Sequence, residues 1–244
     1  MSETTSRPLL SLVIPVKNEE ANIVALAAEI DRALAGVTYA WEAVWIDDGS
    51  TDKSLIIMRG LKPPHRYLKL DRNHGQSAAF MAGFQGARGE WVGTLDGDGQ
   101  NDPVDLVRQL DHALKTGVDM VNGIRAKRQD TLVRKWSSRL ANGVRNRLTG
   151  RTVQDVGCST RVVRRECLLH LPFFHGMHRF LPTLVAMRGH RLAEIPVNHR
   201  PRAGGKSKYG INNRLWSGLR DLFGVRWLIS RNRVWTVAED GPTE

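Results

Sequence analysis

Short apolar stretches alternate with helical patterns through the first half of the chain. Strands are expected at residues 10–15, 41–46, 66–70 and 91–95. Pro15 should stop the first of them. Apolar side chains recur at helical spacing over residues 21–34 and 78–87, with Asn18 or Asn22 as the cap of the first helix. Strand, loop and helix repeat about every 30 residues, which predicts a mostly parallel sheet with crossover helices.

A polar loop follows each of the four expected strands. These loops are residues 16–20, 47–52, 73–77 and 96–100. In a parallel sheet, ligands bind outside the carboxyl ends of the strands. We therefore expect the four loops to converge on one crevice.

The fourth loop has the composition of a metal site. Asp96 and Asp98 stand one residue apart, and Gln100 follows two positions later. Such oxygen donors suit Mg²⁺ or Mn²⁺ holding a diphosphate, since a hard cation completes its shell with substrate oxygens. An EF-hand needs Gly and Glu where this chain has Asn101 and Val107, so a calcium loop is excluded. A plain polar turn remains the alternative reading of these residues by themselves.

Taken together, the loops resemble a known family. Motifs at residues 15–19, 47–52, 73–76 and 96–100 occur in the order seen in family 2 glycosyltransferases. The second half resembles the polyprenyl-phosphate branch of that family, typified by dolichol-phosphate mannosyltransferase, through the motifs at residues 123–125, 155–161, 178–182 and 202–209. The resemblance runs from about residue 10 to about residue 227.

This resemblance implies an α/β fold of the GT-A type of nucleotide-diphospho-sugar transferases, with flanking helices and amphipathic C-terminal helices. A chain of 244 residues can form one such domain. We expect a single catalytic domain over residues 1–230 and a basic, then disordered, tail over 231–244. Within the domain, the expected parts are a donor and metal half (8–122), an acceptor half (123–212) and an interfacial helix region (213–230).

The implied reaction moves a sugar from a GDP- or UDP-linked donor to a dolichyl- or undecaprenyl-type phosphate, with inversion to a β-linked product. The lipid phosphate is already an anion near pH 7, so it needs no strong general base. The harder tasks are to stabilise the leaving diphosphate and to align two phosphates that repel each other. Lys17 stands where many relatives have an aromatic residue beside the base, which leaves the nucleotide open.

The resemblance also implies roles for individual residues. The donor nucleotide is expected at Pro15, Glu19, Asp47, Asp48, Gly75, Gln76 and Asp96. The metal, Mg²⁺ or Mn²⁺, is expected at Asp96, Asp98 and Gln100. The acceptor phosphate is expected at Arg125, Arg134, Ser138, Arg202 and Lys208. The catalytic residues would be Asp96, Asp98, Arg125 and Arg202.

Charge is divided unevenly along the chain. Residues 1–122 have a net charge of −5 and residues 123–244 one of +16, which together give the +11 of the whole chain. The second half should therefore meet an anionic partner: phosphate, an acidic lipid surface or nucleic acid. A solvated basic face is the alternative.

Two apolar stripes with tryptophan and neighbouring arginine lie in this basic half, around Trp136 and from Leu215 to Trp227. They predict helices lying in the membrane interface, although a core-facing role is equally compatible with the pattern. No stretch approaches the ~18 apolar residues of a spanning helix, and no leader is visible. We therefore expect a cytoplasmic chain on the inner membrane face, attached by its own helices or through a separate integral membrane partner.

Two other functions compete with this one. A family 2 enzyme acting on a sugar or protein hydroxyl would need a carboxylate base, for which Asp155 is the evident candidate in the second half. A nucleic-acid-binding module could use the basic half, but no known module is legible, and the carboxylates of the first half would repel a backbone. We therefore expect no nucleic acid partner.

Overall fold

A seven-stranded sheet forms the centre of the molecule in a computed structural model, which describes residues 7–125, 150, 153–200 and 211–234, with residues 211–219 as backbone only. The strands are β1 (Leu10–Val16), β2 (Trp41–Asp47), β3 (His65–Lys69), β4 (Trp91–Thr94), β5 (Met120–Arg125), β6 (Arg161–Arg164) and β7 (Leu192–Val197). Their order is β3-β2-β1-β4-β6-β5-β7, with β6 antiparallel to both neighbours and the other pairs parallel. The predicted mostly parallel sheet is confirmed.

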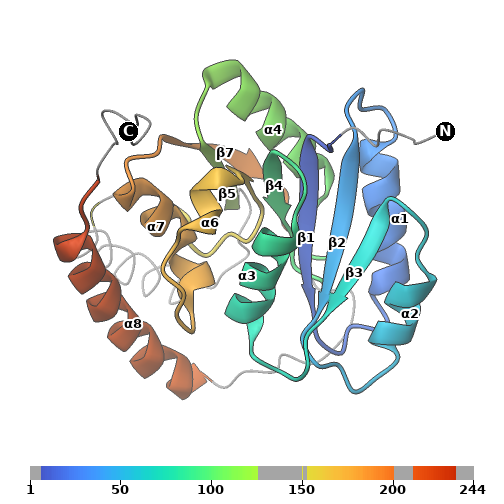
Figure 1. Cartoon of the computed structure of the whole chain (residues 1–244), viewed down its shortest axis with the longest axis horizontal. Coiled ribbons are helices and arrows are strands. Elements are labelled where there is room, and N and C mark those ends of the chain that lie inside the picture. Colours follow the sequence, from blue (N-terminus) through green and yellow to red (C-terminus); the bar gives the residue numbers. More distant parts are fainter. Residues whose placement is uncertain (1–6, 126–149, 151–152, 201–210, 235–244) are drawn as a thin grey trace, which may run out of the picture.

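Helices cover both faces of the sheet (Figure 1). They are α1 (Ile23–Leu34), α2 (Ser54–Gly60), α3 (Gln76–Gly86), α4 (Val104–Thr116), α6 (Glu166–Leu169), the 3₁₀ helix η1 (Met177–Phe180), α7 (Leu181–Met187) and α8 (Ile211–Arg231). Alternate residues of each strand face opposite layers. In β1, Leu12 and Ile14 belong to a hydrophobic cluster that includes residues of α1, α2 and α4, while Val13 belongs to one that includes residues of α3, α6, α7 and α8.

The proline expected to end β1 lies inside the strand. Pro15 pairs with Ile46 of β2, and the strand continues to Val16. The next residues show why this is tolerated: the amide of Leu95 donates to Val13 on the β4 side, and the amide of Asp48 donates to Val16 on the β2 side. Pro15 therefore turns its missing N–H toward the side where β4 has already ended, so no ladder bond is lost.

The start of the first helix also differs from expectation. Asn22 occupies the N-cap position of α1 but makes no side-chain capping bond. Its Nδ2 atom instead donates to Oε2 of Glu19 at 2.7 Å. Asn18 has a positive φ of 52° and binds the neighbouring loop. Both asparagines thus shape the loop after β1 and leave the helix end uncapped by a side chain.

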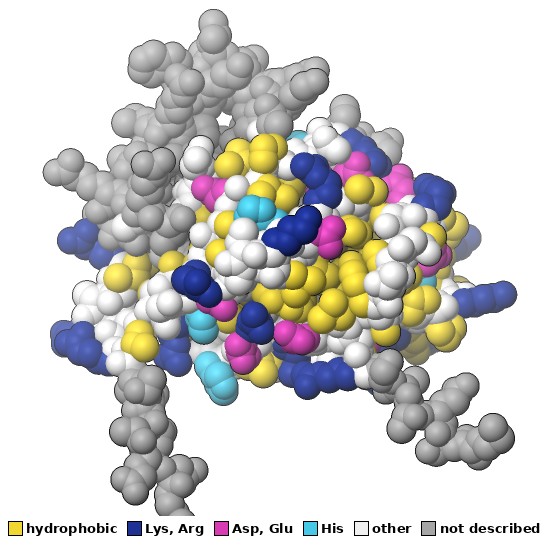
Figure 2. Space-filling model, turned by 90° about the horizontal axis from the view of Figure 1, so that it is seen from above, with side chains coloured by type: hydrophobic (Ala, Val, Ile, Leu, Met, Phe, Trp, Pro, Cys, Tyr) yellow, Lys and Arg dark blue, Asp and Glu magenta, His cyan; other side chains and the backbone are white. Residues whose placement is uncertain are grey.

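Helix α8 packs on the outer side of the α7 layer (Figure 1). Leu222 and Val225 are buried against the core, whereas the side chains of Phe223 and Trp227 are 61% and 60% exposed. No helix in the described ranges is long and apolar enough to cross a membrane. On the face drawn in Figure 2, basic and acidic side chains are interspersed around a central apolar area, so this face is not uniformly basic.

Candidate active site at the carboxyl ends of the strands

The loops after β1 and β2 are joined by hydrogen bonds in both directions. The backbone amide of Asn18 donates to Oγ of Ser50 at 3.0 Å, and the amide of Thr51 donates to Oδ1 of Asn18 at 2.7 Å. The amide of Glu19 donates to Oγ of Ser54 at the start of α2. The loop that carries Glu19 is thereby fixed against the loop that carries the two aspartates at the end of β2.

The second and third loops are joined by Asp48. Its Oδ1 atom accepts from the amide of His74 at 2.7 Å, and its Oδ2 atom accepts from the amide of Gly75 at 3.0 Å. Gly75 has a φ of +87°, and a Cβ there would lie 3.1 Å from Cε1 of His175. Glycine is therefore needed for the turn that presents these amides to Asp48.

The third and fourth loops meet at Asp96, whose Oδ1 atom accepts from Nε2 of Gln76 at 2.9 Å. The fourth loop closes back on the first, because a Cβ on Gly97 would lie 3.0 Å from the carbonyl oxygen of Pro15 and 3.9 Å from Cγ of Glu19. The four loops therefore form a closed ring, as their places at one edge of a parallel sheet predict.

The oxygen atoms of the fourth loop suit a hard divalent cation. Burial raises the pKa of Asp96, and the nearby Asp98 carboxylate raises it further, while hydrogen bonds from Ser159 and Gln76 oppose the change. A divalent cation would relieve this repulsion. The Nε2 atom of Gln100 donates to the carbonyl of Arg200 at 3.2 Å, so Oε1 is the end that could ligate a cation.

These residues therefore fit a cation that takes few protein ligands and completes its shell with substrate oxygens. The described residues contain no group of three or more His, Cys, Asp or Glu side chains suited to a closed protein cage.

Arg125, at the end of β5 and expected from the sequence to bind the acceptor phosphate, binds Asp155 through two parallel hydrogen bonds. Its Nε and Nη2 atoms each lie 2.7 Å from a different oxygen of the carboxylate. Both side chains are mostly buried, with 16% and 14% exposed. A Cβ on Gly157 would lie 2.9 Å from Nη2 of Arg125, so glycine makes room for the guanidinium.

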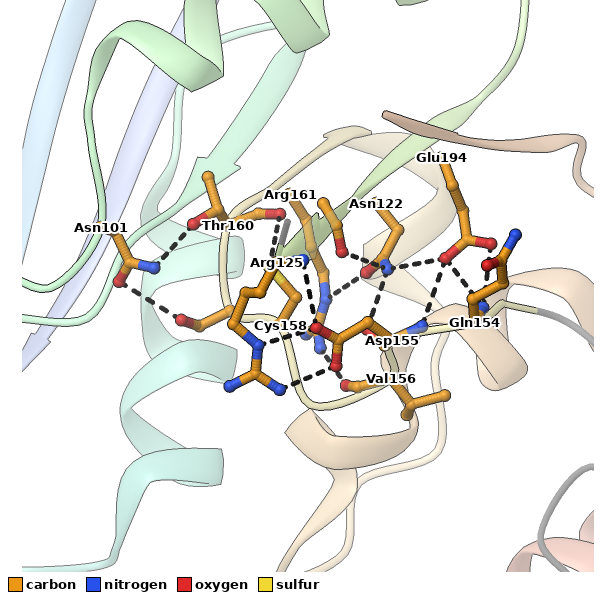
Figure 3. A network of polar contacts seen from close by, with 12 residues as sticks. Asn101, Asn122, Arg125, Gln154, Asp155, Val156, Cys158, Thr160, Arg161 and Glu194 are labelled. Carbon is orange, nitrogen blue, oxygen red and sulfur yellow. Dashed lines mark hydrogen bonds and ion pairs between the residues drawn. The ribbon is translucent and has the colours of Figure 1, made fainter. Parts of the chain in front are cut away.

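Behind this pair lies a polar network (Figure 3). Glu194 of β7 accepts from the backbone amide of Gln154 through both oxygens at 2.9 Å. Asn122 of β5 donates to the carbonyl of Asp155 at 3.0 Å and accepts from Nε of Arg161 at 3.0 Å. This network holds the turn that presents Asp155 to Arg125.

Arg161 links the two sides of the site and was not assigned a role from the sequence. Its guanidinium donates to the carbonyls of His178 and Val156 and to Oδ1 of Asn122. Burial lowers its pKa, while Cys158, Asp96 and Asp155 raise it. A charged residue opening the apolar run Val162-Val163 is the sequence signal that could have marked it.

His178 lies on the donor side of this link. Its Nδ1 atom is 2.7 Å from Oγ of Ser77, which also accepts from the amide of Gly176. The direction of the Ser77–His178 hydrogen bond depends on the histidine tautomer, since either the hydroxyl or the ring nitrogen can donate. Burial lowers the pKa of His178 to about 3, and the charges of Arg179, Arg161 and His175 act in the same direction. The imidazole is thus neutral at physiological pH.

Most residues predicted to bind the donor or the metal lie together in the ring of loops: Pro15, Glu19, Asp48, Gly75, Gln76, Asp96 and Asp98. Asp47 is buried, and its Oδ1 atom accepts from the amide of Ser50 within the second loop. Arg125 lies at the same edge of the sheet, since β5 is parallel to β4. The predicted acceptor residues Arg134, Ser138, Arg202 and Lys208 lie outside the described residues.

Residues 11–171 match the model of the family described as glycosyl transferase family 2. The chain belongs to glycosyl transferase family 2. It is 37% identical over 229 residues to the dodecaprenyl-phosphate galacturonate synthase of Rhizobium johnstonii, covering 90% of this chain and 67% of that protein. It is 38% identical over 215 residues to the undecaprenyl-phosphate 4-deoxy-4-formamido-L-arabinose transferase of Edwardsiella ictaluri, covering 86% and 66%. The chain thus spans about two thirds of the length of these relatives.

These relatives confirm the resemblance of this family 2 chain to the polyprenyl-phosphate branch. Among solved structures, it is similar to glucosyl-3-phosphoglycerate synthase from Mycobacterium tuberculosis in complex with Mn²⁺, UDP and glucosyl-3-phosphoglycerate. That likeness has a TM-score of 0.64 at 21% identity and covers 92% of this chain and 80% of the other. It confirms the GT-A fold expected from the sequence.

Proposed function

We propose that this family 2 glycosyltransferase moves a sugar from a nucleoside diphosphate sugar to a polyprenyl phosphate, with inversion and with the help of Mg²⁺ or Mn²⁺. The closed ring of loops around Asp96 and Asp98 carries the proposal. It brings two carboxylates and an amide oxygen to the edge where a parallel sheet binds its ligand. The relatives named for dodecaprenyl and undecaprenyl phosphate support the acceptor.

On the donor side, Pro15, Glu19, Asp47, Asp48, Gly75, Gln76 and Asp96 are the proposed nucleotide-binding residues. Asp48 serves them by holding the third loop in place through two backbone amides. A cation bound at Asp96, Asp98 and Gln100 would offset the charge that develops on the departing diphosphate.

On the acceptor side, the proposed phosphate ligands are Arg125, Arg134, Ser138, Arg202 and Lys208. Arginine suits this task because its planar fork binds phosphate oxygens in pairs. The acceptor phosphate is itself the nucleophile, so the site has only to align it and to exclude water. Catalytic roles follow for Asp96, Asp98, Arg125 and Arg202.

The contacts of Asp155 favour this acceptor over a sugar or protein hydroxyl. Both carboxylate oxygens accept from the Arg125 guanidinium, which stabilises the ionised form. A general base in that state would hold an abstracted proton poorly. Asp155 is therefore better suited to orient Arg125 than to activate a hydroxyl.

We place the enzyme on the cytoplasmic face of the membrane, where α8 presents Phe223 and Trp227 to the interface beside exposed Arg226. A separate integral membrane partner would serve the same purpose. The division into a donor half (8–122), an acceptor half (123–212) and an interfacial region (213–230) is part of this proposal.

A donor panel tests the proposal. Purified chain with Mn²⁺ would be incubated with undecaprenyl or dolichyl phosphate and a series of GDP- and UDP-linked sugars, including galacturonate, 4-deoxy-4-formamido-arabinose and mannose donors. The expected result is sugar in the organic phase for one donor, β-linked if the donor is α-linked. Sugar transfer to a water-phase hydroxyl acceptor instead would favour the competing function.

A further inference from the structure

The segment that follows β7 is joined at the backbone to the fourth loop (residues 96–100), called the metal loop from here on. The amide of Arg200 donates to the carbonyl of Gln100 at 2.9 Å, and Nε2 of Gln100 donates back to the carbonyl of Arg200 at 3.2 Å. The adjacent residues Asn101 and His199 form an antiparallel bridge. Gln100 is therefore held on both its main chain and its side chain by a single residue from the far end of the sequence.

The guanidinium of Arg200 fixes that residue in turn. Its Nη1 atom lies 2.8 Å from Oε2 of Glu29 on α1, and its Nη2 atom lies 3.0 Å from Oδ2 of Asp102. Asp102 also accepts from the side chain of Asn198 at 3.3 Å. Burial opposes the charge of Arg200, but Asp102 and Glu29 raise its pKa above the ordinary value. The Arg200 side chain thus links α1, through Glu29, to the residue pair that directly follows the metal loop, through Asp102.

The orientation of the Gln100 amide decides whether it can bind a cation. A side-chain amide presents an oxygen to a metal only when its nitrogen end is directed elsewhere. The carbonyl of Arg200 takes that nitrogen, so Oε1 is the atom left for the cation. Residues that orient ligands in this way commonly change metal affinity when they are replaced.

We propose that Arg200 is a positioning residue for the metal site, acting through Gln100, with Glu29 and Asp102 as its anchors. This inference rests on the proposed metal-dependent function. It assigns a task to two charged residues, Arg200 and Glu29, that carry no role in the family motifs quoted above.

Mn²⁺ binding to the full chain tests the inference without measuring activity. Free Mn²⁺ would be followed by electron paramagnetic resonance in the presence of UDP, with GDP in a parallel series. Arg200→Gln should weaken Mn²⁺ binding about tenfold. Arg200→Lys, which keeps one charged contact, should recover part of the loss. Arg191→Gln is the matched control, because Arg191 is an exposed arginine just before the opposite end of β7.

A double-mutant cycle separates positioning from a general structural effect. If Arg200 acts through Gln100, then Gln100→Ala and Gln100→Ala/Arg200→Gln should bind Mn²⁺ equally well. A further tenfold loss in the double variant would overturn the inference, and so would wild-type Mn²⁺ affinity in Arg200→Gln. If Arg200→Gln fails to fold, Glu29→Gln replaces it. Its expected loss of Mn²⁺ affinity is smaller, because Arg200 keeps its contact with Asp102. Unchanged affinity in Glu29→Gln would also contradict the inference. If the wild-type chain fails to bind Mn²⁺ in the presence of UDP and also in the presence of GDP, the proposed function itself is overturned.

Discussion

The proposed donor and acceptor sides of this site place their charged side chains against different partners. Asp48 and Asp96 accept hydrogen bonds from neutral amides, which hold the carboxylates in place. Arg125 instead faces a carboxylate, Asp155, at 2.7 Å in a bidentate pair. The proposed donor side therefore presents carboxylates that a divalent cation can bind. On the proposed acceptor side, Arg125 is already paired with a carboxylate, whereas the buried Arg161 donates to backbone carbonyls.

The two ligands would therefore meet different sites. The donor and its metal would bind to loops that hydrogen bonds already hold together. An acceptor phosphate would have to share Arg125 with Asp155, because removing either partner of a buried pair leaves an unmatched charge. Additional cations are then needed to make phosphate binding favourable. The proposed residues Arg134, Arg202 and Lys208 would supply them.

The largest expected effect is on the donor side. Asp98→Ala should lower transfer by about 10³-fold or more, because the leaving diphosphate loses the cation that offsets its charge. Folding should be preserved, since Asp98 is partly exposed and accepts from the amide of Gln100 within its own loop. The measurement is turnover with Mn²⁺ alongside a thermal melt. Undiminished turnover of this variant in EDTA-treated buffer would remove the metal from the account.

A smaller loss is expected on the acceptor side. Arg202→Ala should cost on the order of 2–4 kcal/mol in kcat/KM for lipid phosphate, the usual range for a lost charge-assisted contact to a reacting anion. Donor affinity measured by calorimetry should hardly change. Loss of donor binding with lipid binding kept would contradict the acceptor role of Arg202.

Membrane attachment should respond more modestly. Phe223→Ser combined with Trp227→Ser should weaken co-sedimentation with anionic liposomes on the order of tenfold, because two exposed apolar side chains leave the interface. Ile56→Ser is the matched control, since Ile56 is 69% exposed on α2. Binding should also fall as salt rises. Equal sedimentation of the double variant and the wild type would place attachment elsewhere.

The last prediction concerns stability rather than activity, at His178. The pKa of His178 is about 3 in the folded chain, against an ordinary value of 6.5, so folding favours the neutral ring. The stability that depends on the neutral ring is fully present above about pH 6.5 and is lost as the pH falls toward 3. His178→Gln should therefore flatten the acid loss of stability by about 1 kcal/mol per pH unit in that window. Parallel pH profiles from urea unfolding would argue against a neutral buried His178.

The sequence predicted the first half of the fold well for a physical reason. Its strands end in loops rich in Gly, Asp and Asn, and buried parallel strands read as continuous apolar runs. The second half gave no comparable signal, because β6 is a short antiparallel strand that begins with the charged Arg161. The place of Pro15 inside β1 depended on where β4 ends, which no local pattern of the sequence contains.

The same limit applies to the site. The metal loop is contiguous in sequence, so Asp96, Asp98 and Gln100 could be named together before the fold was known. The partners that hold them are distant: Gln100 and Arg200 are 100 residues apart, and Arg200 and Glu29 are 171 apart. Sequence spacing carries no information about such contacts. They appear only when β7 and α1 are brought to the same edge of the sheet.

The most direct test compares two lipids that differ only in the acceptor phosphate. The full chain, Mn²⁺ and the donor found in the panel would be incubated with undecaprenyl phosphate or with undecaprenol, and organic-phase sugar would be counted for each. The account predicts product with the phosphate, none with the alcohol, and none with either lipid for Asp98→Ala. Equal transfer to the alcohol would contradict it, because the site would then need the hydroxyl-activating base that the Arg125–Asp155 pair does not provide.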